Sequence, residues 1–117
     1  MRRIARTDGN QQELMNYLRT LGASVLDLHK VGGGAPDILV GIAIPRPILL
    51  PAGYRLNLLA EIKNPKRFPS QRKLNPLETD FHRDWRGQIS VIETLNDCLK
   101  LLKIGEYNCV NSSCFQL

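Results

Sequence analysis

The sequence predicts a single α/β domain with the element order α-β-β-β-α-β-α, a mixed sheet flanked by helices. Two observations carry this prediction: the composition is that of an ordinary globular protein, and helical and strand periodicities alternate along the chain. The 117 residues are 43% apolar and 23% charged, enough to build one core without disulfides. We assign residues 1–105 to the domain and 106–117 to a loosely held tail. Since no run of eighteen apolar residues occurs, no membrane span is expected.

Capping residues mark three helices, expected over residues 8–21, 76–86 and 95–104. Each begins at a residue that favours an N-cap and stops before a glycine. The N-cap and stop pairs are Asp8 and Gly22, Asn75 and Gly87, and Thr94 and Gly105.

Four short apolar runs predict strands at residues 24–29, 36–41, 56–63 and 89–92. Between the second and third, Pro45, Pro47 and Pro51 exclude a helix or a central strand. Residues 42–55 are therefore predicted to form an edge hairpin or an apolar loop. A basic loop with prolines is expected over residues 64–74.

The charge balance favours a polyanionic partner. Sixteen Lys and Arg residues against eleven Asp and Glu give a net charge of +5, which points first to nucleic acid. A solubilising surface would give the same charge. Cys98, Cys109 and Cys114 are too few and too scattered for a disulfide framework or a zinc site. Free thiols in a reducing compartment, the cytoplasm, are expected.

The residues with the clearest chemical potential are Asp37, Glu61 and Lys63. Side chains alternate along a strand, so Glu61 and Lys63 share one face, roughly 6.5 Å apart, while Ile62 points into the core. If Asp37 lies on the adjacent strand, two carboxylates and an ammonium converge. With the backbone carbonyl of Ile62, they would suit Mg²⁺ or Mn²⁺, which prefer oxygen ligands. An ordinary surface ion pair beside a turn aspartate is the alternative.

Motifs in a fixed order resemble a known family. A helix with Asp8-Gly9-Asn10-Gln11-Gln12-Glu13 precedes the glycine loop Gly32-Gly33-Gly34 and Pro36-Asp37; Glu61-Ile62-Lys63 and Phe81-His82-Arg83-Asp84-Trp85-Arg86-Gly87 follow. This arrangement resembles the PD-(D/E)XK nuclease superfamily, in particular its small stand-alone, phage-type VRR-NUC members. The resemblance implies a restriction-endonuclease-like core and a metal-dependent endonuclease that hydrolyses DNA phosphodiester bonds. The host cytoplasm would be its location if the chain is phage-encoded.

The resemblance also implies roles for single residues. Asp37, Glu61 and Lys63 match the metal-binding and catalytic triad, and Glu13 matches an extra acidic residue near the metal, although a solvated helix glutamate is equally consistent. Glu78 stands where related nucleases tend to carry Gln, so it either bonds Lys63 or faces solvent. His82, four residues on, would contact a phosphate or lie partly buried.

The predicted DNA contacts lie around the triad. They are His29, Lys30, Gly33, Gly34, Lys66, Arg67, Arg72, Lys73 and His82. Phosphate contacts of this kind give affinity without sequence preference, so duplex or branched DNA, such as a Holliday junction, is the expected partner. Cutting both strands requires two sites, so we expect a homodimer through residues 42–51. A non-catalytic DNA-binding or adaptor module on the same scaffold is the alternative.

Overall fold

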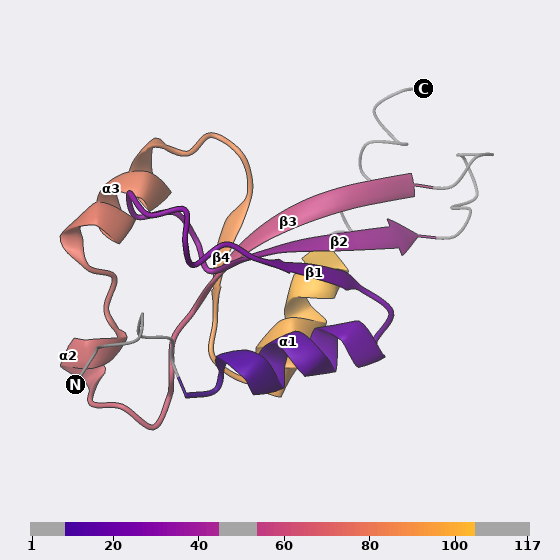
Figure 1. Cartoon of the computed structure of the whole chain (residues 1–117), viewed down its shortest axis with the longest axis horizontal. Coiled ribbons are helices and arrows are strands. Elements are labelled where there is room, and N and C mark those ends of the chain that lie inside the picture. Colours follow the sequence, from indigo (N-terminus) through magenta and orange to yellow (C-terminus); the bar gives the residue numbers. More distant parts are fainter. Residues whose placement is uncertain (1–8, 45–53, 105–117) are drawn as a thin grey trace.

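The computed structural model describes residues 9–44 and 54–104. Its elements are α1 (Gln11–Thr20), β1 (Ser24–Asp27), β2 (Ile38–Ile44), β3 (Tyr54–Ile62), α2 (Pro69–Arg72), α3 (Pro76–Asp84) and β4 (Ile89–Ile92). Residues 95–104 form a further helical segment, drawn in orange and yellow in Figure 1. The predicted mixed α/β architecture and its element order are confirmed, with the short helix α2 added inside the predicted basic loop.

The four strands form one sheet in the order β1-β2-β3-β4. The pairs β1/β2 and β2/β3 are antiparallel, whereas β3/β4 is parallel. A parallel neighbour requires a crossover, and here the crossover holds α2 and α3. The sheet is therefore mixed because β1, β2 and β3 form an antiparallel unit and the crossover through α2 and α3 adds β4 parallel to β3.

The core lies between one face of the sheet and two helices. Alternate residues of β2 and β3, such as Val40 and Leu58, are buried against Leu14 and Leu18 of α1 and against Leu101. Figure 1 shows α1 and the helical segment 95–104 below the sheet, and both contribute residues to one core cluster. Leu14 and Leu18 thus form the core face of α1, whereas Leu21 lies beyond the helix and is exposed.

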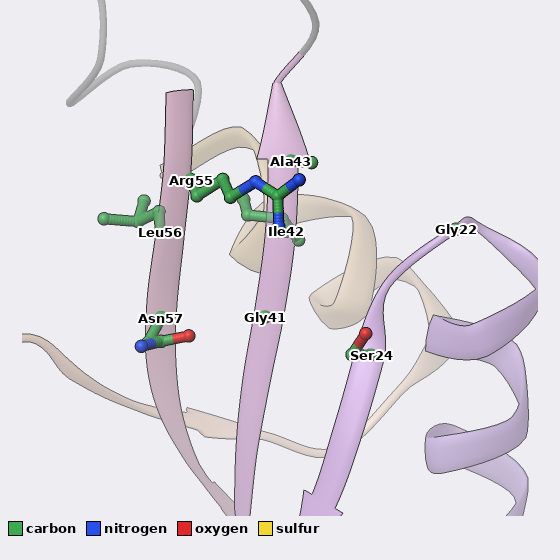
Figure 2. A pocket seen from close by; sticks show the side chains of 8 residues that line it. All are labelled: Gly22, Ser24, Gly41, Ile42, Ala43, Arg55, Leu56 and Asn57. Carbon is green, nitrogen blue, oxygen red and sulfur yellow. The ribbon is translucent and has the colours of Figure 1, made fainter. Parts of the chain in front are cut away.

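The opposite face of the sheet is open at the far end of β2 and β3. Three strands place Ser24, Gly41 and Asn57 in one line. These residues line a hollow of about 340 Å³ together with Gly22, Ile42, Ala43, Arg55 and Leu56. Figure 2 shows Ser24 and Asn57 on either side of Gly41, with Arg55 extending beside Ala43. Because Gly41 carries no side chain, the surface is hollowed between Ser24 and Asn57.

The start of α1 differs from the prediction. The helix begins at Gln11 with Asn10 at its N-cap position, not at Asp8, which lies outside the described residues. The Asn10 side chain does not cap the helix. Its Nδ2 instead donates to the backbone carbonyls of Lys63 at 3.1 Å and Glu93 at 2.9 Å, so it bridges the ends of β3 and β4.

Other boundaries move by a few residues. The first strand ends at Asp27, the second and third are displaced toward residues 45–53, and α3 ends at Asp84 because Trp85 has extended backbone. The last strand is as predicted. Phe81 and Trp85 stack on each other; Phe81 is half-buried and Trp85 is 46% exposed, so neither belongs to the main core.

Some predictions fall on residues that the structure does not describe. They concern most of the proline-rich dimer segment, the tail 106–117, Cys109 and Cys114. Cys98 is a buried free thiol, and burial raises its pKa to about 11. Within 9–44 and 54–104, no helix is long and apolar enough to cross a membrane.

A backbone contact fixes α3 against the glycine loop. Gly34 has a φ of 81°, and a Cβ at this position would lie 2.3 Å from the carbonyl oxygen of Leu77 in the first turn of α3. The contact is possible only because Gly34 has no side chain. Figure 1 shows the loop running alongside α3 at the end of the sheet.

We predict that Gly34→Ala lowers the free energy of unfolding by more than about 2 kcal/mol, because it adds a backbone clash to the strain of a positive φ. The matched control is Gly32→Ala, at φ 76° with no atom within 4 Å of the added Cβ, which should cost only about 1–2 kcal/mol. Urea denaturation measures both. Equal losses in the two variants would contradict the proposed contact.

Candidate active site

The register of β2 and β3 brings two acidic residues together. Ile38 pairs with Ala60, so Asp37, one residue before β2, lies across from Glu61. The backbone N–H of Ile62 donates to Asp37 Oδ2 at 2.7 Å. The Asp37 carboxylate is thereby held against the end of β3, beside the next side chain of the motif.

Glu61 is buried although it points away from the main core. Its side chain is 2% exposed, and His82 of α3 lies against it. Burial raises the pKa of Glu61 to about 10, with further contributions from a hydrogen bond to Asp37 and from the negative charges of Asp37 and Glu78; Lys63 opposes the rise. Without a cation, Glu61 is therefore a neutral carboxylic acid at neutral pH.

Lys63 is held by Glu78. Its Nζ donates to Glu78 Oε1 at 2.8 Å, and the two side chains are only 11% and 14% exposed. The same oxygen accepts the backbone N–H of Asn75 at 3.0 Å, as part of the capping box that begins α3. Burial would raise the pKa of Glu78, but the hydrogen bonds from Lys63 and Asn75 outweigh it and lower the pKa. The question that the sequence left open is answered: Glu78 bonds the lysine.

His82 faces the carboxylic acid. Its Nε2 lies 3.8 Å from Glu61 Oε1, too far for a hydrogen bond, and both atoms are buried without a hydrogen-bond partner among the described residues. Burial lowers the pKa of His82, the charge of Lys63 lowers it further, and that of Glu78 opposes the change. Two neutral groups with unused polar atoms therefore face each other at neutral pH.

These residues fit a hard divalent cation. Glu61 Oε1 is an orphaned buried acceptor, and the carboxylates of Asp37 and Glu61 with the Ile62 carbonyl supply only oxygen donors, as Mg²⁺ and Mn²⁺ prefer. Across residues 9–44 and 54–104, no three His, Cys, Asp or Glu side chains are arranged to hold one ion. An ion held by these residues would complete its shell with water and substrate oxygens.

The chain is similar to a VRR_NUC domain of known structure. The likeness covers 80% of this chain and 89% of that chain, with 23% sequence identity and a TM-score of 0.48. No family model matches the sequence, and no significant match exists among curated proteins.

Glu13 does not join the carboxylate pair. Its side chain is exposed on α1 and lines a separate hollow with Asn10, Asn64 and Lys66 among others. The buried polar residue of this helix is Gln11, 4% exposed, whose Oε1 has no hydrogen-bond partner among the described residues. Glu13 near a metal stays a prediction, and the helical spacing of Gln11 with Leu14 and Leu18 was the signal for its burial.

The predicted DNA contacts differ in their exposure and in the side chains that they already contact. Arg72 makes two hydrogen bonds to Glu93, at 2.8 and 3.3 Å, and His29 Nδ1 lies 2.8 Å from Asp27 Oδ1. Arg67 is half-buried. The exposed residues are His29, Lys30, Gly33, Lys66 and Lys73. The positive charges of Lys30, Lys66 and Lys73 are thus more accessible to solvent than those of Arg67 and Arg72.

We predict that the metal-free protein loses stability as pH rises. Glu61 keeps its proton in the folded state up to a pKa of about 10 but loses it near 4.5 when unfolded, so the folded state binds more protons in this window. The stabilisation is complete below the unfolded pKa and declines with a slope near 1.4 kcal/mol per pH unit.

Urea denaturation in EDTA at about pH 7.5 and pH 9 should therefore show a fall of about 2 kcal/mol. Glu61→Gln, which cannot titrate, is the control and should show little of this fall. Identical pH dependence in the two proteins would exclude a protonated Glu61.

Proposed function

We propose that this chain is an endodeoxyribonuclease that hydrolyses phosphodiester bonds with the help of Mg²⁺ or Mn²⁺. The observation that carries the proposal is the pair of Asp37 and Glu61, one of them buried and neutral, beside a lysine fixed by Glu78. Burying such a group is unfavourable unless a bound ion or a reaction uses it. The resemblance of the sequence motifs to PD-(D/E)XK nucleases points to the same chemistry.

Asp37, Glu61 and the carbonyl of Ile62 would hold the ion. When bound, the ion polarises the phosphodiester and lowers the pKa of a water molecule. Glu61 must release its proton for this, because carboxylate ligands bind in the ionised form. The short bond from Ile62 N–H keeps Asp37 in place meanwhile.

Lys63 supplies the positive charge for the reacting phosphate. Its ammonium lies near Glu61, whose pKa it lowers, and can stabilise negative charge that develops on the phosphate. Glu78 holds this ammonium in one position and so acts as a positioning residue. His82 of α3 lies against Glu61, and the carboxyl group of Glu61 is buried from bulk water.

DNA is the proposed substrate, and the chain is proposed to act as a homodimer. The net charge of +5 favours a polyanion, and Lys30, Lys66 and Lys73 are exposed for phosphate contacts. Two copies would place one site on each strand. Branched DNA is included as a structure-specific substrate. A non-catalytic DNA-binding module, which the acidic Glu78 in place of Gln would suit, is the competing proposal.

We predict that Asp37→Asn and Lys63→Ala each reduce cleavage of supercoiled plasmid by at least about 100-fold, because single charge-stabilising groups commonly contribute this much. Cleavage should require Mg²⁺ or Mn²⁺ and stop with EDTA. A dimer should produce linear DNA without prior accumulation of nicked circles. The control Lys66→Ala should mainly weaken binding and its salt dependence.

A four-way junction assayed in parallel distinguishes a junction-specific enzyme from a general endonuclease. DNA binding by the wild type without any cleavage, in either metal, would favour the non-catalytic module instead.

We also predict that Glu78→Ala lowers kcat by about 10- to 100-fold with little change in KM, because a displaced lysine stabilises the transition state less well. Glu78→Gln keeps an acceptor for Lys63 and should retain more activity than Glu78→Ala. Ile104→Val, on the core-facing segment 95–104 and outside the capping box, costs about 0.5–1.5 kcal/mol and controls for loss of stability alone. Equal kcat values for Glu78→Ala and the wild type would exclude the positioning role.

A further inference from the structure

A second face of α3 carries a hollow beside the candidate active site. It measures about 330 Å³ and contains the stacked rings of Phe81 and Trp85, whose centroids lie 5.2 Å apart with 16° between the planes. The indole is 46% exposed and Leu77 is 60% exposed. The hollow is lined by Gly33, Leu77, Asp80, Phe81, Asp84 and Trp85.

The polar groups of this hollow favour a neutral ligand over a phosphate. Asp80 and Asp84 both bind Arg83 at the surface, with the closest atoms 3.1 and 2.8 Å apart. The two carboxylates can accept hydrogen bonds from N–H groups, whereas they repel an anion. A flat aromatic surface edged by acceptors complements a nucleobase, which has a π face and amino donors.

One wall of the hollow is bare backbone. Gly33 has a φ of 67°, and a Cβ added there would have no atom within 4 Å. A ligand ring can therefore approach the loop closely at this position. The apolar floor, the two acceptors and the bare wall together leave space for one planar group.

The position of the hollow links it to the scissile phosphate. Phe81 precedes His82, which faces Glu61. The Cα of Trp85, the C-cap residue that ends α3, lies about 4.5 Å from that of His82 along the helix axis at 1.5 Å per residue. Gly33 lies in the loop that leads to Asp37. The distance between His82 and Trp85 along the helix axis is on the order of the 3.4 Å advance per nucleotide of a strand. A base next to the phosphate in the site can therefore reach the hollow. In a paired, stacked duplex that base has both faces covered.

We propose that this hollow binds one unpaired nucleobase of the strand being cut, stacked on Trp85, so that the protein prefers DNA with an unpaired nucleotide beside the scissile phosphate. The proposal rests on the nuclease function proposed above and specifies its substrate class.

Trp85 is the only tryptophan of the 117 residues, so intrinsic tryptophan fluorescence reports on this hollow directly. The full chain would be titrated in EDTA with three DNAs: a perfect duplex, the same duplex with one unpaired nucleotide, and that DNA with an abasic site in its place. We expect quenching by the unpaired base and little by the other two. Binding followed by anisotropy of labelled DNA should favour the unpaired base by about tenfold, the scale of one base–aromatic stack.

Trp85→Ala should abolish this preference, and Trp85→Phe, which keeps an aromatic face, should retain part of it. Leu99→Ala, an exposed apolar side chain on the helical segment 95–104, is the control and should leave the preference intact. Equal quenching by the perfect duplex, or an unchanged preference in Trp85→Ala, would overturn the proposal while normal cleavage left the nuclease function standing. If the wild type neither binds nor cuts any of the DNAs, both proposals fail.

A change in molecular mass of Trp85→Ala in light scattering, without quenching of the wild type by DNA, would assign the hollow to a contact between copies and would likewise overturn the proposal.

Discussion

The hydrogen bond from Ile62 N–H to Asp37 Oδ2 is the contact on which the candidate site depends. At 2.7 Å it joins the loop before β2 to the end of β3, and it holds the half-buried Asp37 carboxylate beside Glu61. The raised pKa of Glu61 follows first from its burial against α3 and then from this neighbouring carboxylate. The capacity of the site for a cation follows from the same pairing, because a proton and a metal ion compete for the same oxygen atoms.

The helix α3 completes the site from the other side, and its position is fixed at several points. Gly34 contacts its first turn through backbone atoms, Asn75 caps it, and Glu78 joins the cap to Lys63 through a single oxygen. Helix stability and lysine position are therefore coupled. The same helix presents His82 to Glu61 and the aromatic pair to solvent, so one element serves two neighbouring surfaces.

Much of the fold could be predicted from local signals. The alternation of apolar residues located β4 without error, and Asn75-Pro76 located the start of α3 because cap chemistry is read from a few adjacent residues. The end of α3 and the exposure of Trp85 could not be predicted, since they depend on how far the helix extends past the sheet. Likewise, Asn10 reads as an ordinary turn residue, and its bridging role requires knowing that the ends of β3 and β4 meet beside it.

In the candidate site, too, local features could be predicted from the sequence, whereas features that depend on distant segments could not. The spacing of Asp37, Glu61 and Lys63 suggested a group on one face, but the burial of Glu61 arises from α3, which is distant in sequence. Glu78 and His82 were recognisable as a pair on one helix face, whereas their partners were not. On α1, the rotation of the helix buries Gln11 and leaves Glu13 exposed.

The Asn10 amide has a mechanical consequence. It connects positions 53 and 83 residues away along the chain, which makes it a non-covalent cross-link between α1, the end of β3 and the end of β4. A disulfide in its place would also restrict the unfolded chain. The amide bridge leaves the unfolded chain unrestricted, so its entire effect is to hold three distant segments in fixed relative positions where the backbone leaves the site.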